Sequence, residues 1–257
     1  MEKESDVTII SDSKKAILRG KESFYYHRKI LEKFIIKDKR FLNSFSPIKV
    51  NTNLKIINNM VKVSEICDVG PMASVAGALA DLMLEAMKLR NVNQIVESTP
   101  CKVALVENGG EIAVDSEEPI KIALYAGENE LNLNLGFMIR KKDCPIGIGT
   151  SSATVGHAIS LGQADAVTVF AKNSALADAA ATKICNSVKD PDLEKSIKKG
   201  LDVADDIEGV IGTFISRENK VGQTGKLPQL IKIERDKNIL LRNKLSSSIE
   251  GDFEIFK

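Results

Sequence analysis

Three short segments contain the residue types that binding or catalysis requires. The first is Glu-Asn-Gly-Gly-Glu at 107–111, which lies between two apolar runs. Asn-Gly adopts positive φ angles readily, so this spacing favours a hairpin turn. The alternative is a backbone that passes close to a flat or anionic ligand, which glycine permits because it has no Cβ. Asn108, Gly109 and Gly110 are therefore candidate ligand-binding residues as well as turn residues.

The second segment, residues 147–157, combines glycines with hydroxyl side chains and ends in a histidine, His157. Its hydroxyl residues are Thr150, Ser151, Ser152 and Thr154. Backbone N–H groups and hydroxyls on such a loop can hold a phosphate without a charged side chain. The segment lacks the Gly-Lys-Ser/Thr of a Walker loop and the Gly-x-Ser-x-Gly of a serine nucleophile. We therefore favour a phosphate-binding loop over a polar turn with a structural histidine, and His157 is the candidate catalytic residue.

The third segment is Asp-Ala-Ala-Ala-Thr at 178–182, within a predicted helix of small residues. Asp178 and Thr182 are four residues apart and so lie on one helix face. A carboxylate and a hydroxyl are hard oxygen ligands of the kind that Mg²⁺ takes. Taken alone, the pattern is better explained by a helix cap or by a surface aspartate beside an Ala-rich packing face than by a metal site. Asp81 and Glu85 have the same spacing on an earlier helix, and we interpret them as surface charge.

The surrounding sequence must supply the elements that position these segments. Periodic apolar or small-residue patterns predict helices over 22–41, 53–66, 71–90, 174–188 and 192–204. Short apolar runs predict strands from about 101 to 171 and again over 208–216 and 229–235, and residues 5–19 are interpreted as a short hairpin. Strands grouped in the middle and flanked by helices predict an α+β fold with mixed or antiparallel sheets. No linker divides the chain, so we expect a single domain over 1–257 with a weakly patterned tail after about 236.

Composition and charge restrict the class of protein. The 257 residues are 43% hydrophobic and 28% charged, as in soluble globular proteins, and the net charge of +1 gives no overall sign of nucleic-acid binding. Residues 1–62 carry a net charge of +7 and residues 63–182 a net charge of −7, an asymmetry that permits self-association into a homo-oligomer. The longest stretch without charged residues, 144–164, is too polar to cross a membrane.

The start of the chain and its cysteines indicate a compartment. The charged start lacks the apolar region of a secretory signal. The four scattered cysteines show no Cys-x-x-Cys spacing, which argues against a zinc site and against a disulfide framework. We therefore expect a cytoplasmic protein.

Five motifs, in order, are similar to those of one family. They are Gly-Pro-Met-Ala-Ser-Val-Ala-Gly at 70–77, Val-Glu-Asn-Gly-Gly-Glu-Ile at 106–112, Gly-Thr-Ser-Ser-Ala-Thr-Val-Gly-His at 149–157, Ala-Asp-Ala-Val-Thr-Val at 164–169 and Ala-Leu-Ala-Asp-Ala-Ala-Ala-Thr at 175–182. The chain resembles uncharacterised protein family 0280, a group of ApbE-like proteins from archaea and bacteria. The resemblance covers about residues 65–190 strongly and the ends weakly.

The resemblance implies an ApbE-like fold and, from the ApbE flavin transferases of the wider superfamily, a pocket for a flavin (FAD or FMN) with Mg²⁺. It implies Asp178 and Thr182 as Mg²⁺ ligands, because their segment is similar to the Asp-Ala-Leu-Ala-Thr metal motif of the transferases. Two departures argue against transferase activity. The transferases have Asp-Pro shortly after their histidine, whereas His157 is followed by Ala-Ile-Ser, and they have Lys-Gly where this chain has Ala76-Gly77.

Two functions from different classes follow. In the first, the protein binds a flavin or another nucleotide-like, phosphate-bearing ligand, with Mg²⁺, and the sequence leaves open whether it acts as an enzyme. In the second, it is a non-catalytic assembly or sulfur-metabolism accessory protein that uses the same fold as a docking surface. A cysteine-based sulfur carrier is a variant of the second, with Cys144 as the cysteine to test, although a small buried hydrophobe is the more frequent role of such a residue.

Overall fold

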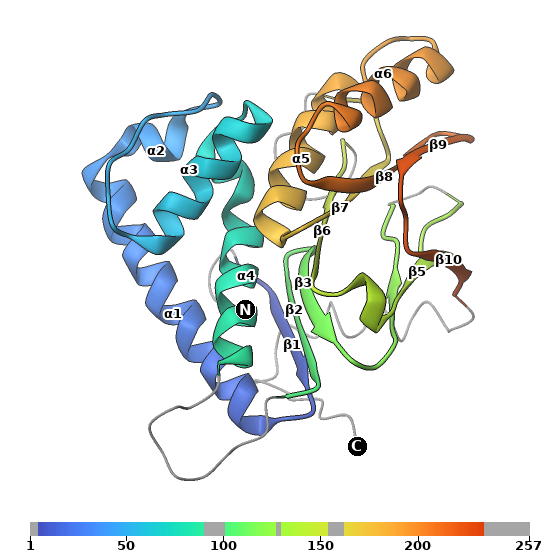
Figure 1. Cartoon of the computed structure of the whole chain (residues 1–257). Coiled ribbons are helices and arrows are strands. Elements are labelled where there is room, and N and C mark those ends of the chain that lie inside the picture. Colours follow the sequence, from blue (N-terminus) through green and yellow to red (C-terminus); the bar gives the residue numbers. More distant parts are fainter. Residues whose placement is uncertain (1–4, 90–100, 127–129, 154–161, 234–257) are drawn as a thin grey trace.

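The computed structural model describes residues 5–89, 101–126, 130–153 and 162–233. Figure 1 shows three layers: a group of helices, a large sheet behind them, and a small sheet on the far side of the large one. The helices are α1 (Lys14–Lys37), α2 (Lys39–Asn43), α3 (Lys55–Cys67), α4 (Val75–Lys88), α5 (Ser174–Ser187) and α6 (Leu193–Asp205), with short 3-10 turns at Pro71–Ser74 and Lys141–Asp143. The strands are β1 (Val7–Ser11), β2 (Val103–Asn108), β3 (Glu111–Ser116), β4 (Ile120–Ala123), β5 (Leu135–Ile139), β6 (Ile146–Ser151), β7 (Ala166–Ala171), β8 (Val210–Arg217), β9 (Lys220–Gly225) and β10 (Gln229–Lys232).

Both sheets are antiparallel throughout the part of the chain that the structure describes. The large sheet has the order β1-β2-β3-β6-β7-β8-β9, and the small sheet has the order β10-β5-β4. Helices α4 and α5 pack on one face of the large sheet and on each other. The predicted fold class, helices with antiparallel sheets in one domain, is confirmed.

The large sheet is apolar on both faces, which explains the near-continuous apolar runs in its strands. In β2, Ala104 and Val106 join the core under the helices, while Leu105 between them joins the core under the small sheet. The second core includes an edge-to-face contact between Phe137 of β5 and Phe170 of β7, with ring centroids 4.8 Å apart. The alternation fixes which face each residue of a strand occupies, and this decides the geometry of the candidate site.

Two local predictions differ from the structure. Residues 5–19 form β1 and then the start of α1, so the predicted hairpin is wrong. Ser13, within the segment predicted as a hairpin, is the N-cap of α1 and accepts a hydrogen bond from the backbone N–H of Ala16. Strand β9 was not predicted because Lys-Val-Gly-Gln-Thr-Gly contains no apolar run. Such polarity suits β9, since a strand at a sheet edge is protected from unwanted pairing by polar residues.

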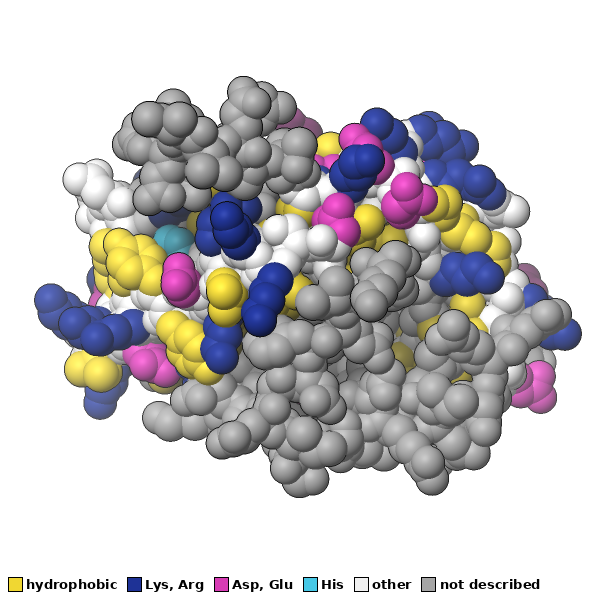
Figure 2. Space-filling view, turned by 90° about the horizontal axis from the view of Figure 1, so that it is seen from below, with side chains coloured by type: hydrophobic (Ala, Val, Ile, Leu, Met, Phe, Trp, Pro, Cys, Tyr) yellow, Lys and Arg dark blue, Asp and Glu magenta, His cyan; other side chains and the backbone are white. Residues whose placement is uncertain are grey.

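Figure 2 shows one face of the molecule, on which small groups of apolar side chains are separated by Lys, Arg, Asp and Glu side chains. Within the described residues, no single helix is long and apolar enough to span a membrane. Helix α3 and the segment Pro71–Lys88 pass that test only as a pair, and the pair is bent by 104° at the break between them.

Candidate ligand-binding site

Two of the three predicted segments meet at the start of α4. Asn108, buried at the end of β2, donates a hydrogen bond from Nδ2 to the carbonyl oxygen of Ala76 at 3.1 Å. Asp178, on α5, accepts one at Oδ2 from the backbone N–H of Gly77 at 3.0 Å. The two segments therefore hold the same peptide group, the one between Ala76 and Gly77 in the first turn of α4: the Asn-Gly-Gly segment at its carbonyl oxygen and the Asp-Ala-Ala-Ala-Thr segment at its N–H.

The Asn-Gly-Gly segment is the hairpin turn that its spacing favoured. Strands β2 and β3 pair on either side of it, with Asn108 opposite Glu111. Gly109 and Gly110 have φ angles of 68° and 116°, which side chains disfavour. A Cβ on Gly110 would have no described atom within 4 Å, so the backbone conformation rather than close packing requires glycine there. Contact of this turn with a ligand stays a prediction.

The second segment begins as a strand rather than a loop. Thr150 and Ser151 end β6, and the two glycines before them pack against α5. A Cβ on Gly149 would lie 2.6 Å from the backbone of Ala177 and of Asp178, which is too close for any other residue without movement of the helix. These glycines therefore bring α5 close to the sheet, and the contact of this segment with a phosphate stays a prediction.

The pleat of β6 separates its two hydroxyl residues. Thr150 lies on the same face as Ile148, towards the small sheet, and its Oγ1 is 3.1 Å from Oγ1 of Thr168 on β7. Ser151 lies on the face of Gly149, towards α5. The structure thus brings Ser151, and not Thr150, to the side of the sheet that holds Asp178.

The remaining predicted residues are placed as follows. Ser152 comes directly after β6, and Thr182 is partly buried one turn beyond Asp178 on α5. Thr154 and His157 lie outside the described residues. Among the described residues, one further carboxylate was missed: Glu111, which by its pairing with Asn108 lies on the helix-bearing face at the same end of the sheet.

Helices α4 and α5 cap each other through a shared tetrapeptide. Ala-Leu-Ala-Asp occurs at 78–81 in α4 and at 175–178 in α5. Asp81 accepts hydrogen bonds from the backbone N–H groups of Ser174 at 2.8 Å and Ala175 at 2.9 Å, at the start of α5. Asp178 does the same for Gly77 at the start of α4. The interpretation of Asp81 as surface charge is wrong, whereas Glu85 is exposed and pairs with Lys55.

The two capping carboxyl groups are electrostatically strained. Loss of water around Asp178, and to a smaller extent the nearby Asp81, raises its pKa to about 7, although the N–H groups of residues 76 and 77 oppose the rise. Desolvation likewise raises the pKa of Asp81 to about 6. Neither carboxylate forms an ion pair with a residue that the structure describes. A cation at Asp178 would relieve this cost.

The donor set at Asp178 fits a hard cation that keeps other ligands. In the described part of the chain, no group of three or more His, Cys, Asp or Glu side chains could hold a metal ion. Asp178 and Thr182 supply one carboxylate and one hydroxyl, so a metal here would need phosphate oxygens or water to complete its shell. Mg²⁺ is typically bound in this way, through one or two carboxylates and a substrate phosphate.

The four cysteines are free thiols, and Cys67, Cys101 and Cys185 are buried. Cys144, partly buried, precedes Pro145 at the start of β6, at the end of the sheet opposite Asn108. Desolvation raises the pKa of its thiol, even though a hydrogen bond from the backbone of Ser116 opposes this. A raised pKa lowers the thiolate fraction at neutral pH, which is the opposite of what sulfur transfer requires.

Comparisons with known proteins define the family. The chain matches the family model described as AbpE bacteria over residues 1–208. A UPF0280 protein of Methanocaldococcus jannaschii is 40% identical over 91% of this chain and 92% of its own length, and one of Methanococcus vannielii is 40% identical over 91% and 92%. The chain therefore belongs to the UPF0280 family of ApbE-like proteins.

Solved structures with some similarity are flavin transferases. The flavin transferase ApbE of Vibrio cholerae is 15% identical, with a TM-score of 0.41 over 69% of this chain and 62% of that one. The apo flavinyl transferase ApbE of Pseudomonas stutzeri is 18% identical, with a TM-score of 0.37 over 61% of this chain and 48% of that one. The chain thus matches between about half and three fifths of the length of these transferases.

Proposed function

We propose that this protein binds a phosphate-bearing ligand of the flavin or nucleotide type, together with Mg²⁺, at the end of the large sheet where α4 begins. The observation that supports this most is the convergence of Asn108 and Asp178 on the single peptide group between Ala76 and Gly77. Two motifs separated by about 70 residues in the chain thereby share one turn of helix. Flavin is the first ligand to test, because the ordered motifs resemble those of flavin transferases.

Each residue has a distinct role in this proposal. Asn108 orients the start of α4, and the backbone at Gly109 and Gly110 faces the ligand. Hydroxyls of Ser151 and Ser152 donate hydrogen bonds to phosphate oxygens, with Thr150 reached only by a ligand that extends around the end of β6. Asp178 and Thr182 hold Mg²⁺, which when bound neutralises phosphate charge. Thr154 and His157 belong to the same proposal, with His157 as the candidate acid or base.

The proposal stops at binding, and covalent flavin transfer is not part of it. Ala76 carries no ammonium group at the position where the transferases have lysine, so the chain lacks a charge that a transferred phosphate would meet. The residues after His157, Ala158-Ile159-Ser160, lack the Asp-Pro of the transferases. Any reaction at the site would have to proceed without these two elements.

Calorimetric titration with FMN and FAD, with and without Mg²⁺, tests the proposal. Native mass spectrometry and the absorbance spectrum of the purified protein would reveal a flavin that is retained during purification. Asp178→Ala should weaken binding only when Mg²⁺ is present, by about one to two decades, as expected for loss of a charged contact. The matched control is Asp202→Ala, which removes an exposed carboxylate from α6. Unchanged binding by Asp178→Ala, or its failure to fold, would make Asp178 a purely structural cap and refute the metal site.

Two hydroxyl variants distinguish the faces of β6. Ser151→Ala should weaken binding with or without Mg²⁺, because its proposed partner is the phosphate. Thr150→Val tests the original assignment of the phosphate to Thr150, whose hydroxyl is already paired with Thr168. A loss confined to Thr150→Val would place the phosphate on the face of the small sheet and contradict the arrangement proposed here.

The second candidate, a non-catalytic accessory protein, is favoured by exposed apolar side chains on the outer helices. Tyr26 and Ile36 of α1 are 64% and 76% exposed, and Phe45, after α2, is 80% exposed. Large exposed apolar residues are typical of protein contact sites when they are contiguous. A colourless protein that binds neither FMN, FAD nor nucleotides in the presence of Mg²⁺ would favour this candidate. The raised pKa of Cys144 argues against its sulfur-carrier form.

A further inference from the structure

A cleft of about 410 Å³ lies on the other side of the α4–α5 crossing from the candidate site. Helix α3 lines it with Asn59, Lys62, Val63 and Ile66, and helix α4 with Asp81, Leu84, Glu85 and Lys88. Both sets have the spacing i, i+3, i+4, i+7, so each helix turns one stripe of side chains towards the cleft. The ends of β3 and β6 and the start of α5 complete the walls through Asp115, Pro145, Ile146, Lys172, Asn173 and Ala175.

The inner walls of the cleft are apolar. Val63, Ile146 and Ala175 are buried, and Ile66 and Leu84 are partly buried with surface facing the cleft. The volume falls within the range of pockets that hold small organic ligands. An aromatic ring or a short aliphatic chain could therefore replace water on these walls with a favourable transfer free energy.

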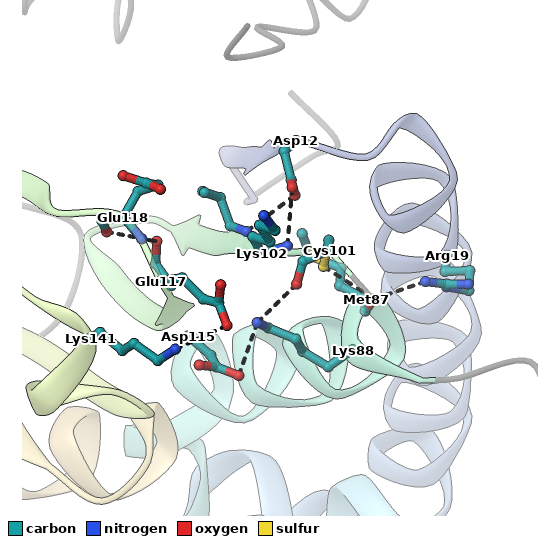
Figure 3. Close-up of polar contacts among 12 residues, drawn as sticks. Asp12, Arg19, Met87, Lys88, Cys101, Lys102, Asp115, Glu117, Glu118 and Lys141 are labelled. Atoms are coloured by element: carbon teal, nitrogen blue, oxygen red, sulfur yellow. Dashed lines mark hydrogen bonds and ion pairs between the residues drawn. The ribbon is translucent and has the colours of Figure 1, made fainter. Parts of the chain in front are cut away.

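The acidic groups of the cleft already have partners. Glu85 pairs with Lys55 at 2.6 Å, and Asp81 accepts the first N–H groups of α5. Figure 3 shows Lys88 extending from the end of α4 to Asp115, with Nζ 3.1 Å from its carboxylate and 3.2 Å from the carbonyl oxygen of Cys101.

Two of the basic groups that line the cleft have no ion-pair partner in the part of the chain that the structure describes. Lys62, on α3, and Lys172, just before α5, are exposed, and neither forms an ion pair with any residue in the described ranges. Asp81 also forms no ion pair among the described residues, so its negative charge offsets one of these lysines, and the unpaired charge around the cleft is a net +1. The start of α5 cannot attract an anion itself, because Asp81 occupies its N–H groups.

We propose that this cleft is a second binding site, for a small molecule with an apolar ring or chain and one anionic group, a carboxylate or a phosphate. The apolar part packs on Leu84 and Ile146, and the anionic group lies between Lys62 and Lys172. Charge complementarity favours an anion, since Glu85 and Asp115 are in ion pairs and the two lysines without one outnumber the single carboxylate without one, Asp81. The site is separate from the one that contains Asp178.

Fluorescence titration of the full-length protein with 2-naphthoate and with 2-naphthyl phosphate tests the proposal and separates the two kinds of anion. The uncharged 2-naphthamide and the cationic 2-naphthylmethylammonium have the same ring and report the contribution of charge. We expect at least one anion to bind, the amide to bind on the order of tenfold more weakly, and the cation more weakly still. Amide resonances of Val63 and Ala175 should shift on binding.

The double variant Lys62→Gln/Lys172→Gln should weaken binding of the anion on the order of tenfold, because two exposed ion pairs are lost. Its matched control, Lys121→Gln/Lys142→Gln, removes two exposed lysines elsewhere and should bind as the parent does. Asp178→Ala should also bind 2-naphthoate normally, so failure of the proposed flavin site and failure of this one can be told apart. Equal binding of acid and amide, preference for the cation, unchanged binding by the double variant, or no binding at all would overturn the proposal.

Discussion

The raised pKa of Asp81 predicts a pH-dependent contribution to stability. Its carboxyl group holds a proton more tightly in the folded protein, with a pKa of about 6, than at its ordinary value of 3.8. Because the folded state binds the proton more tightly, Asp81 contributes most to stability below about pH 4, and this contribution is lost as the pH rises through about 6. Replacement by asparagine removes the titration and keeps one oxygen that can accept an N–H of α5.

The magnitude follows from the pKa difference. At about 1.4 kcal/mol for each tenfold change in proton affinity, a rise from 3.8 to about 6 corresponds to about 3 kcal/mol. Asp81 is partly exposed, and solvent screening reduces this to roughly 1–2 kcal/mol. The free energy of unfolding of Asp81→Asn, relative to the wild type, should therefore increase by roughly 1–2 kcal/mol between about pH 4 and about pH 8.

Urea unfolding followed by circular dichroism at several pH values measures this difference. Comparison with Asp202→Asn, which changes an exposed carboxylate on α6, corrects for general effects of charge. Wild type and Asp81→Asn curves that run parallel across the whole pH range would show that Asp81 titrates normally, and the account of a desolvated cap would be wrong. The constant difference between such parallel curves would then measure only the loss of the cap, which is worth about 1 kcal/mol.

Three further predictions concern metal, chemistry and packing. Chelation by EDTA should leave the far-ultraviolet circular dichroism unchanged, since the core consists of apolar strands and close-packed helices; loss of helical signal would show a structural metal. Incubation with FAD, Mg²⁺ and an acceptor protein should add no flavin mass to the acceptor, because Ala76 replaces a lysine of the transferases, and robust flavinylation would restore that activity. Gly149→Ala should lower the free energy of unfolding by about 1–3 kcal/mol, since its Cβ would lie 2.6 Å from the backbone of α5, whereas Ala153→Ser at an exposed position should change it little.

Much of the fold was predictable because its elements have clear periodicity. Strand β5 was predicted at its observed bounds, and α5 and α6 within one residue at each end. The start of α1 was not, since Val-Thr-Ile-Ile and Ala-Ile-Leu look alike as short apolar runs. The Ser13 cap, a local hydrogen bond, decides between strand and helix there.

The candidate site was predictable in its residue types and less so in its geometry. From helical spacing alone, Asp81 and Asp178 cannot be distinguished from ordinary surface residues of a helix. Their partial burial depends on Gly77 and Gly149, which let two helices and a strand approach closely. Contacts between segments so far apart in the chain cannot be inferred from a local sequence pattern. The sheet faces of Thr150 and Ser151 could not be predicted without knowing the register of β6, because a shift of the strand by one residue exchanges the two faces.

The reciprocal caps of α4 and α5 also bear on how the chain folds. The hydrogen bonds that complete the two first turns join residues 101 and 93 positions apart in sequence. Helix α4 therefore cannot form its native cap at Gly77 until α5 has been synthesised, and water must serve that N–H group in the meantime. Contacts of such sequence separation slow folding. A fragment that ends before residue 174 should consequently remain unfolded or aggregate, and the native state should form as one cooperative step late in synthesis.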